Sequence, residues 1–447
     1  MIKNILFGLL AFVALVGCNN DDDDYFEDYY GDTLIQDLPG KTYVPDDVFE
    51  QSLIDYGYDD VLDNFVATDN IKNLRELNID WDPDKQGDKI TDLTGIQNFK
   101  KLEVLKCNSH DLTFLDLSNN KLLKELECHW NLLETIDVRR NKELRKLDCG
   151  GNLIENLDVT NNLLLIELRA INPLKSLDIS NNKSLEYLSC GVNFVWKSIP
   201  DTSRKLKKLD ISNNLKLRSL HIIVSEIENL DVSEHTALER LTCSRSNLTN
   251  LNIRNNDLLK YLDCNSNQLT TLDISNNTKI EVLKCGDNQI SSLGLEDKKN
   301  LRFLWCINNK LTNLNVSNNN LLYQLSCSNN QIDYLDVKNK KELIRLHCNN
   351  NQLLSLDVAS NELMRELECK ENQITELDVS NMKGLQYLFC DSNKLTSLDV
   401  SNNTGLQLFH STDNEIECIK VSDRQLDSFT KQWYKDDTTI WSLDCDS

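Results

Sequence analysis

The chain has 447 residues, a length that by itself predicts about two to four domains. Its formal charge is −23, from 71 acidic and 48 basic residues, which argues against nucleic-acid partners because binding to phosphates needs Lys and Arg. A hydrophobic content of 40% is enough for a core and excludes a wholly disordered chain. Leu and Asn are strongly over-represented, against only 14 Gly and 5 Pro. This bias indicates a repeated unit, and the odd number of 15 Cys means that they cannot all pair in disulfides.

The first 18 residues carry a targeting pattern. Lys3 precedes an apolar run over residues 5–16 that is too short to span a bilayer, and Leu15-Val16-Gly17-Cys18 follows. This order resembles a bacterial lipoprotein signal, in which cleavage occurs just before the Cys. The resemblance implies a signal peptide over residues 1–17 and lipidation of the Cys18 thiol, which holds a protein on a membrane without a spanning helix. An ordinary secretory peptide with a chance Cys is the alternative.

Residues 18–40 are predicted to form an acidic tether. Four aspartates, Asp21–Asp24, follow the signal closely, and the first basic residue after Lys3 is Lys41. Like charges repel one another, so the segment is expected to hold the folded part away from the membrane. Its position also resembles the acidic export signal of lipoproteins that face outward from the outer membrane. We therefore expect an outer-membrane, lipid-anchored protein facing the cell exterior, with a plain linker as the alternative.

A 21-residue register runs through most of the chain. Eight cysteines follow one another at this spacing: Cys243, Cys264, Cys285, Cys306, Cys327, Cys348, Cys369 and Cys390. Cys107, Cys128 and Cys149 precede them at the same spacing, and Ala170, Cys190, Ile222 and Ser411 complete the column. Each position ends a Leu-x-x-Leu-x-Cys segment, and an Asn usually lies three residues later. The cysteines are predicted to be small buried hydrophobes, since each coil has only one of them and other residues replace them.

The second half of each unit has the same alternation of apolar and polar residues, with a column of Asp at the polar position, as in Leu272-Asp273-Ile274. The members of this column are Asp116, Asp137, Asp158, Asp178, Asp210, Asp231, Asp273, Asp336, Asp357, Asp378 and Asp399. The alternation places the apolar residues inside and Asp outside, as the two-residue period of a strand requires. Counting the columns gives about fifteen coils over residues 102–422.

These nested half-repeats resemble those of bacterial leucine-rich-repeat proteins with a 21-residue unit. The resemblance covers roughly residues 74–422. Because the second half has no helical period, we expect a mainly β solenoid with short parallel strands on both sides of each coil. With strands about 4.8 Å apart, fifteen coils make a rod of roughly 70 Å. The Asn residues are expected to bond turn backbone and the equivalent Asn of the next coil.

The two ends of the solenoid need covers. In residues 41–101 the segment from Pro45-Asp46 to Gly57 predicts a capped amphipathic helix, and residues 74–79 and 90–96 are predicted to be entry strands. In residues 423–447 the apolar residues Leu426, Phe429 and Trp433 have helical spacing. Cys418 and Cys445 lie outside the column and are predicted to form a disulfide that fixes the tail to the last coil.

One coil is irregular. Between Cys190 and Leu209 it carries about 11 extra residues, including Phe194, Trp196 and Pro200. The extra length predicts a loop that leaves one edge, and loops on rigid scaffolds often bind ligands. Simple drift in length is the alternative.

No pattern for catalysis is evident, so we expect no enzyme activity, no cofactor and no metal site. The six histidines lie on different coils without metal-ligand spacing, and the chain has neither a Gly-rich phosphate loop nor a Gly-x-Ser-x-Gly motif. Calcium binding by the Asp column is the alternative, since stacked carboxylates repel one another unless cations or hydrogen bonds compensate. The column nevertheless tolerates Asn252, Gly294, Asn315 and Lys420, which argues against a dedicated site.

The outward positions beside the Cys column vary from coil to coil, whereas those beside the Asp column are uniform. Exposed aromatic and charged residues are candidates for binding because Trp, Tyr and Arg dominate interaction hot spots. The candidate ligand-binding residues are Tyr261, Phe303, Trp305, Ile307, Arg345, His347, Tyr387 and Phe389. Mutual packing of the rings along the sheet is the alternative.

These features predict a non-enzymatic recognition or adhesion protein that binds a protein or glycan through the variable face. The resemblance implies protein interaction but does not identify the ligand. Glycan capture for nutrient uptake and a purely structural role as an envelope spacer are the alternatives.

Overall fold

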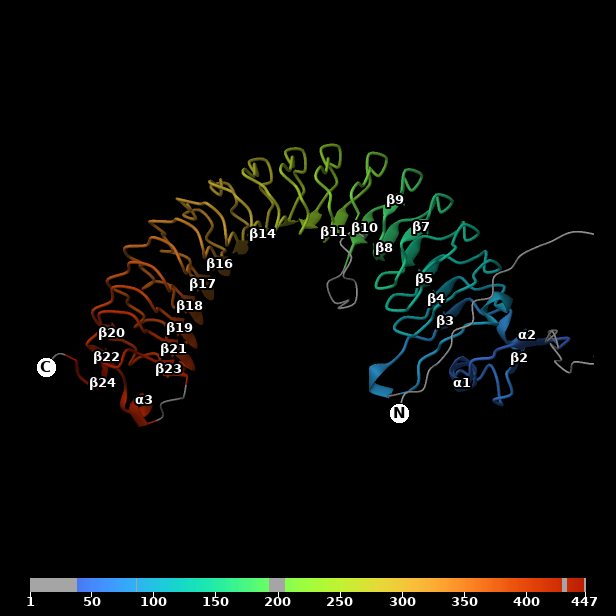
Figure 1. The fold of residues 1–447 in the computed structure, drawn as a ribbon, viewed down its shortest axis with the longest axis horizontal. Coiled ribbons are helices and arrows are strands. Elements are labelled where there is room, and N and C mark those ends of the chain that lie inside the picture. Colours follow the sequence, from blue (N-terminus) through green and yellow to red (C-terminus); the bar gives the residue numbers. More distant parts are fainter. Residues whose placement is uncertain (1–37, 86, 193–205, 428–431, 446–447) are drawn as a thin grey trace, which may run out of the picture.

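The computed structural model describes residues 38–85, 87–192, 206–427 and 432–445. The chain winds into a solenoid of about fifteen coils that bends into an arc (Figure 1). This confirms the predicted fold class, but the molecule is curved and is not a straight rod. Within the described residues no helix is long and apolar enough to cross a membrane. The signal peptide, Cys18, most of the tether and the centre of the irregular loop, with Phe194, Trp196 and Pro200, lie outside the described residues.

One long parallel sheet lines the inside of the arc. Neighbouring strands pair in register, so that Leu262 lies beside Leu241 and Leu283. The sheet is open: its first strand pairs only with the second, and its last strand pairs only with the one before it. Its strands in spatial order are β3 (Glu76–Asn78), β4 (Val104–Lys106), β5 (Glu125–Glu127), β6 (Lys146–Asp148), β8 (Glu167–Ile171), β10 (Tyr187–Gly191), β11 (Ser219–Ile223), β12 (Arg240–Ser244), β13 (Tyr261–Asp263), β14 (Val282–Lys284), β15 (Phe303–Trp305), β16 (Gln324–Ser326), β17 (Arg345–His347), β18 (Glu366–Glu368), β19 (Tyr387–Phe389), β21 (Leu408–His410) and β23 (Trp433–Tyr434).

The core is a continuous column of Leu, Ile, Val and Cys. All twelve cysteines of the ladder are buried and free of disulfides. Some of the thiols donate to a carbonyl of the next coil, as Cys348 does to Glu368 O at 3.4 Å. Burial raises the pKa of these thiols, for example to about 12 at Cys285 and Cys327. The ladder thiols therefore stay protonated and behave as core residues, as the sequence predicts.

A column of Asn residues closes the turn after each inner strand. Asn288 donates through Nδ2 to the carbonyls of Cys264 and Cys285 at 3.0 and 3.2 Å, and its Oδ1 accepts the N–H of Leu269 at 3.0 Å. The expected bonds to turn backbone are present, but these amides bond backbone groups of their own coil and of the preceding coil, and not one another. The residue just before most of these Asn residues has a left-handed backbone, as at Asp287 with φ 53°, which turns the chain away from the strand.

The outer side of the arc has few regular strands. Those present are β7 (Asn156–Asp158) with β9 (Ser176–Asp178), and β20 (Leu398–Asp399), β22 (Cys418–Lys420) and β24 (Ile440–Ser442). Elsewhere each coil still makes backbone bonds to its neighbour, such as Gln268 N to Leu248 O at 2.9 Å. An arc is longer on its outside, so successive coils are spread farther apart there, and the second row of strands is interrupted.

The N-terminal cap covers the first coil. Strand β1 (Lys41–Tyr43) pairs antiparallel with β2 (Phe65–Ala67), and helices α1 (Asp47–Asp55) and α2 (Thr68–Ile71) and the short 3-10 turns η1 (Pro83–Lys85) and η2 (Ile96–Asn98) complete the cap. Asp46 caps α1 by accepting the N–H groups of Val48 and Phe49, as the sequence predicts. Residues 74–79 contain the predicted entry strand β3, but residues 90–96 form no strand, and η2 begins at Ile96.

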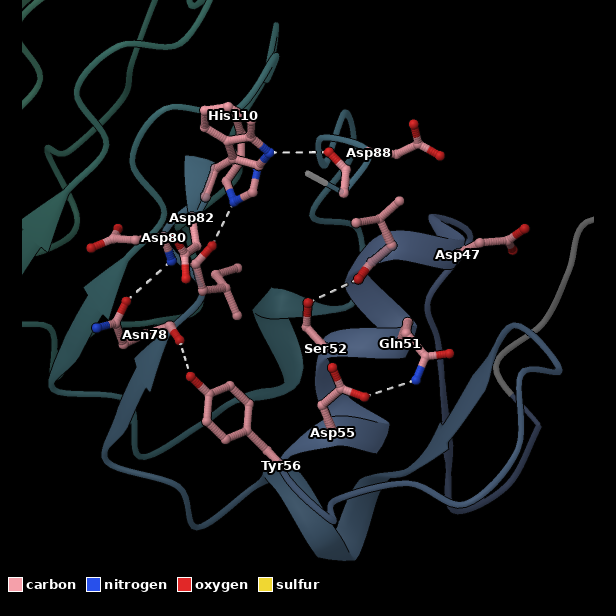
Figure 2. A pocket seen from close by; sticks show the side chains of 14 residues that line it. Asp47, Gln51, Ser52, Asp55, Tyr56, Asn78, Asp80, Asp82, Asp88 and His110 are labelled. Carbon is pink, nitrogen blue, oxygen red and sulfur yellow. Dashed lines mark hydrogen bonds between the residues drawn. The ribbon is translucent and has the colours of Figure 1, made fainter. Parts of the chain in front are cut away.

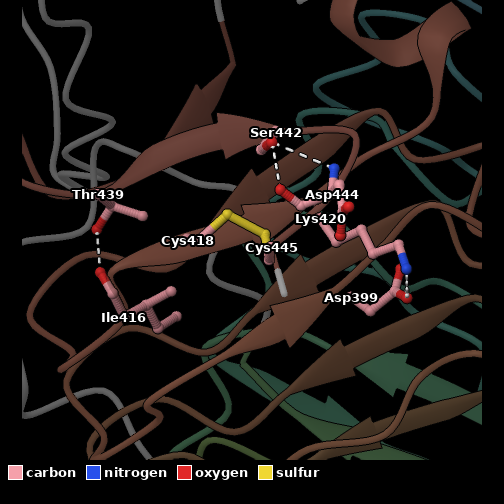
Figure 3. Close-up of a disulfide and its surroundings, with 8 residues drawn as sticks. All are labelled: Asp399, Ile416, Cys418, Lys420, Thr439, Ser442, Asp444 and Cys445. Atoms are coloured by element: carbon pink, nitrogen blue, oxygen red, sulfur yellow. Dashed lines mark hydrogen bonds and ion pairs between the residues drawn. A yellow bond between two sulfur atoms is a disulfide. The ribbon is translucent and has the colours of Figure 1, made fainter. Parts of the chain in front are cut away.

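The C-terminal cap combines a short helix, two strands and a disulfide. Helix α3 (Asp423–Asp427) is followed by β23, so the predicted helical spacing through Trp433 is wrong: this ring packs edge-on against Phe409, with centroids 5.4 Å apart. Cys418 on β22 and Cys445 form a disulfide, with their Cα atoms 5.7 Å apart (Figure 3). The bond joins the two cysteines that the sequence pairs and holds the tail on the last coil.

Candidate functional site

The candidate site is the concave face, formed by the outward side chains of the inner sheet. Because strands pair in register, equivalent positions of successive coils stand beside one another, as Trp305 does beside Lys284 and Ser326. Inward positions are apolar in nearly every coil, with Ser411 as an exception, so it is the outward positions that are free to vary. The structure places seven of the eight predicted binding residues on β13, β15, β17 and β19, with Ile307 just after β15.

A central patch on this face consists of Arg240, Tyr261, Lys284, Phe303 and Trp305. The rings of Phe303 and Trp305 stack in parallel with centroids 5.6 Å apart. Lys284 Nζ lies 4.8 Å from the centroid of Trp305 and 5.7 Å from that of Tyr261, and the Arg240 guanidinium lies 4.4 Å from Tyr261. The rings are half-buried, so mutual packing and partial exposure occur together. Cations therefore cover faces of Tyr261 and Trp305.

A second, C-terminal patch consists of Lys370, Tyr387, Phe389, His410 and Tyr434. His410 packs edge-on between Phe389 and Tyr434, with centroids 4.8 and 4.7 Å away. Lys370 Nζ lies 4.4 Å from the centroid of Phe389. Strands β16, β17 and β18 separate the two patches, a distance of roughly 19 Å at about 4.8 Å per strand. Five of the eight predicted binding residues thus fall into two aromatic patches, while Arg345 and His347 lie on β17 between them.

Strands β17 and β18 bring together His347, Glu366 and Glu368 between the patches. His347 Nε2 lies 3.1 Å from Glu366 Oε1 and 3.9 Å from Glu368 Oε1. On the other side of the ring, Nδ1 is 3.3 Å from the Ser326 hydroxyl. Ser326 is only 2% exposed, so this Ser–His–Glu arrangement offers no reachable nucleophile. The cluster is not evident from the sequence because His347 lies on one coil and the two glutamates on the next, about 20 residues later.

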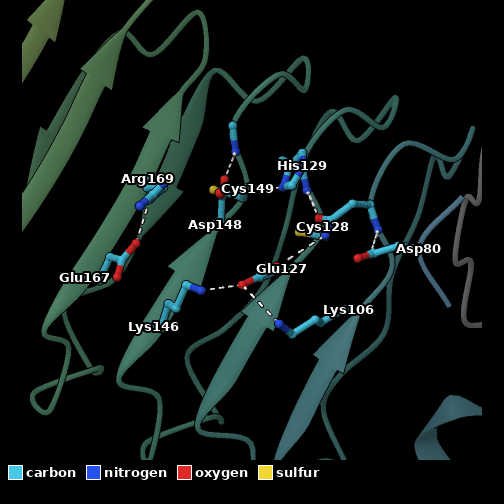
Figure 4. A network of polar contacts seen from close by, with 12 residues as sticks. Asp80, Lys106, Glu127, Cys128, His129, Lys146, Asp148, Cys149, Glu167 and Arg169 are labelled. Atoms are coloured by element: carbon cyan, nitrogen blue, oxygen red, sulfur yellow. Dashed lines mark hydrogen bonds and ion pairs between the residues drawn. The ribbon is translucent and has the colours of Figure 1, made fainter. Parts of the chain in front are cut away.

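The N-terminal part of the face carries a network of alternating charges (Figure 4). Glu127 lies between Lys106 and Lys146, and farther along Arg169 bonds Glu167 at 2.6 Å. Burial alone raises the pKa of Glu127, but the hydrogen bond from Lys146 and the charges of Lys146 and Lys106 outweigh it and lower this pKa to about 2. Glu127 is therefore ionised under all physiological conditions.

A hollow of about 310 Å³ lies beside this network. Its lining includes His129, Trp130, Asp148, Tyr187 and His221. Gly150 and Gly151 leave the space open, since a Cβ on Gly151 would come within 3.0 Å of the Trp130 ring. Burial raises the pKa of Asp148 and lowers that of His221, so the hollow favours neutral forms of both groups.

A larger cavity of about 640 Å³ lies where the N-terminal cap meets β3 (Figure 2). Its carboxylates come from Asp47, Asp55, Asp80, Asp82 and Asp88. At its wall His110 accepts the N–H of Ile90 through Nδ1 and lies 2.5 Å from Ile79 O through Nε2. Burial lowers the pKa of His110, so this ring is a neutral structural bridge. Sequence reasoning missed the cavity, because it forms between cap and solenoid.

The Asp column lies on the opposite, convex face and bonds its own turns. Each carboxylate accepts the N–H two residues later, as Asp273 does from Ser275 at 3.0 Å. Hydrogen bonds from Ser275 and the ion pair with Arg254 lower the pKa of Asp273 to about 2. This face also carries the exposed rings of Phe114 and Tyr334, which are 68% and 60% exposed. Local hydrogen bonds and ion pairs with neighbouring basic side chains thus compensate the repulsion between the stacked carboxylates.

Comparison with solved structures shows the leucine-rich-repeat fold. The functional domain of InlJ from Listeria monocytogenes, which includes a cysteine ladder, is 29% identical over 83% of this chain and 82% of that one, with a TM-score of 0.73. An internalin, InlF, from the same organism is 21% identical over 77% and 95%, with a TM-score of 0.61. A leucine-rich-repeat protein from Leptospira interrogans is 20% identical over 83% and 97%, with a TM-score of 0.58. No protein-family model matches, and a search of curated proteins finds no relative.

Proposed function

We propose that the protein is a non-enzymatic recognition protein that binds a protein ligand along the concave face. One observation carries this proposal: the outward positions of the inner sheet vary from coil to coil, while the core, the turns and the convex Asp column are nearly constant. A scaffold that repeats everything except one surface can encode specificity only on that surface. The similar solved structures include an internalin, which is consistent with a role in adhesion.

The concave face favours a polypeptide over a glycan. Sugars stack on open aromatic faces, but Arg240 covers Tyr261, and Lys284 lies over both Tyr261 and Trp305. The two patches are instead separated by charged residues of both signs, Arg345, Glu366 and Glu368. Alternating apolar and charged surface matches the side chains of a protein ligand. Glycan capture and a structural spacer role remain the competing outcomes of the experiment below.

The experiment replaces the two stacked rings of the central patch, Phe303→Ala with Trp305→Ala. We expect ligand capture to weaken at least tenfold, because removal of central aromatic contacts costs about 2 kcal/mol or more, while the melting temperature stays nearly unchanged. Binding is measured first on arrays of host proteins and of glycans, and then by titration of the strongest hit.

The matched control is Phe114→Ala with Tyr334→Ala, which removes two aromatic rings from the convex face. This control should bind as the parent protein does. Undiminished binding by the double variant Phe303→Ala with Trp305→Ala would show that the central patch is not part of the binding site. Hits on the glycan array alone would favour glycan capture, and no hit on either array would favour the spacer role.

The same proposal includes attachment to the outer membrane through a lipid on Cys18, with the solenoid held outside the cell by the acidic tether. The sequence pattern around Leu15-Val16-Gly17-Cys18 supports it. Metabolic labelling with a fatty acid should mark the parent protein and not Cys18→Ala. Protease added to intact cells should remove the solenoid if it faces outward, and full protection would place it on the inner side.

A further inference from the structure

We propose that His347, Glu366 and Glu368 form a binding site for a divalent transition-metal ion of the zinc class on the concave face. The three side chains project from the paired strands β17 and β18, where His347 stands directly beside Glu368. Each side chain is about one quarter exposed, so the cluster is partly shielded from water but accessible from the concave side. One donor atom of each residue lies within 4.8 Å of the other two.

The neighbours orient these side chains as ligands. Arg345 Nε bonds Glu366 Oε2 at 3.1 Å, and Asn349 Nδ2 donates to Glu368 Oε2 at 2.6 Å. The second oxygen of each carboxylate, Oε1, is thereby turned toward His347 Nε2. Such outer contacts fix the ligands of metal sites, and the ring nitrogen that does not bind the metal usually has a partner of its own. Here that partner is the Ser326 hydroxyl beside Nδ1.

The convergence of three acceptors calls for a cation between them. His347 Nε2 is a buried atom that makes no hydrogen bond to the described residues, although Glu366 Oε1 is only 3.1 Å away. With the imidazole proton on Nδ1, the lone pair of Nε2 faces two carboxylate oxygens, which is repulsive. Either a proton on Nε2 or a metal ion bound by all three atoms removes this repulsion.

The spacing of the atoms suits a tetrahedral ion. Zinc binds His nitrogen and carboxylate oxygen at about 2.0–2.2 Å, which holds neighbouring ligand atoms about 3.3–3.4 Å apart. The two distances from His347 Nε2, 3.1 and 3.9 Å, lie on either side of that value. One imidazole and two carboxylates suit zinc-class metals, whereas calcium requires six to eight oxygens.

Three protein ligands leave the fourth position of the ion open toward the concave face. This part of the inference rests on the proposed function: a carboxylate or imidazole of the bound protein would complete the coordination. The site lies between the central and C-terminal patches, so a ligand that touches both patches must pass over it. The metal would then connect the two aromatic contacts.

The test is calorimetric titration of the untagged protein with Zn²⁺ alone at pH 7.5. We expect saturable binding of one ion per chain, and an affinity at least tenfold lower for His347→Ala and for Glu368→Gln. Glu368→Gln keeps an oxygen for Asn349 and so tests the charge and the metal bond, not the fold. The control His129→Ala removes a histidine from the same face whose ring lies 3.6 Å from Asp148 and far from β17 along the sheet, and should leave binding unchanged.

Absence of saturable binding, or equal affinity in His347→Ala with an unchanged circular dichroism spectrum, would overturn the site. If no saturable binding occurs, a proton on His347, and not a metal ion, compensates the two carboxylates. Because the titration contains no protein ligand, its failure leaves the proposed recognition function untouched, and failure of the concave double variant leaves the metal site untouched. Anomalous diffraction at the zinc edge should place the ion between the three side chains.

Discussion

At the scale of single residues, the second Asn column shows what its position requires. Asn277 is fully buried and donates through Nδ2 to the carbonyls of Ile253 and Asn256 at 2.9 and 3.0 Å, while its Oδ1 has no partner. The same column also contains His235, Lys298, Lys340 and Gln425, and each of these donates to a carbonyl of the preceding coil. The position therefore selects an N–H donor and not asparagine as such; Met382 is the exception.

This requirement predicts a specific order of stability. Asn277→Ala should lower the free energy of unfolding by about 1–2 kcal/mol, because two buried carbonyls each lose one bond. Asn277→Asp keeps the shape but replaces the donor by a carboxylate that faces those carbonyls, so it should be more destabilising than Ala. Urea unfolding followed by circular dichroism measures both.

The neighbouring Asn276→Ala is the control, since Asn276 is exposed and its change should stay within about 0.5 kcal/mol. If Asp at position 277 were tolerated better than Ala, the donor requirement would be wrong.

At the scale of elements, the convex turns depend on ionised aspartates. Hydrogen bonds from Ser275 and the ion pair with Arg254 lower the pKa of Asp273 to about 2, and hydrogen bonds from the following turn likewise lower the pKa of Asp178 and Asp231. A carboxyl whose pKa is lower in the folded state stabilises the fold above its unfolded pKa of about 3.9. This stabilisation is lost as the pH falls toward the folded value.

Asp273→Asn should therefore weaken the fall in stability between about pH 4 and pH 2. Asn252 and Asn315 show that an amide can make the same turn, since their Oδ1 atoms accept the N–H groups of Arg254 and Ser317 at 3.3 and 3.0 Å. Urea midpoints measured across this pH range, for parent and variant, give the comparison. Parallel curves of urea midpoint against pH for parent and variant would show that ionisation of Asp273 does not contribute to the pH dependence of stability.

Asp263, on the concave face, should respond in the opposite direction. Burial raises its pKa, so its ionised form opposes folding at neutral pH, and the penalty disappears as the pH falls through the folded value. Asp263→Asn should consequently stabilise the protein at pH 7 and lose that advantage in acid. Urea midpoints at pH 7 and pH 4 provide the check, and a loss of stability at pH 7 would contradict it.

At the scale of the whole molecule, the ends decide whether the solenoid stays a single unit. Phe409 lies under Trp433 and Trp441, and the strand that carries Trp441 is tied to β22 by the Cys418–Cys445 disulfide. An uncovered last coil would present a complete set of strand-pairing groups and apolar side chains to another copy.

Cys418→Ala with Cys445→Ala should loosen this cap. The bond closes a loop of 27 residues, for which chain entropy gives about 3.5 kcal/mol. We expect faster trypsin cleavage near the C-terminus and concentration-dependent association in size-exclusion chromatography. Cys390→Ala, a change within the buried ladder, is the control and should do neither. Equal cleavage rates for parent and double variant would show that the disulfide is not needed for the stability of the cap, which would then come from the packing of Trp433 and Trp441.

The sequence predicts the repeat, the core and the concave face, because period-21 columns fix which residues stack. Prediction from the sequence fails where contacts depend on three-dimensional geometry and not only on the 21-residue period. The curvature and the interrupted outer strands arise from the different coil spacing on the two sides, and Trp433 joins the sheet because Phe409 offers it a partner. The cluster of His347 with Glu366 and Glu368 is not evident in the sequence because its side chains come from adjacent coils.

The constant register of the solenoid also governs how such a protein can change in length. Every hydrogen-bonded column returns after one coil, so deletion or duplication of a complete coil restores each contact to an equivalent partner, as between Asn256, Asn277 and their carbonyls. Loss of half a coil would instead shift the register, so that residues of the Asp column would stack on residues of the Cys column. Unequal recombination within the gene would thus yield folded products in whole-coil steps, each adding or removing one row of concave side chains while both caps remain the same.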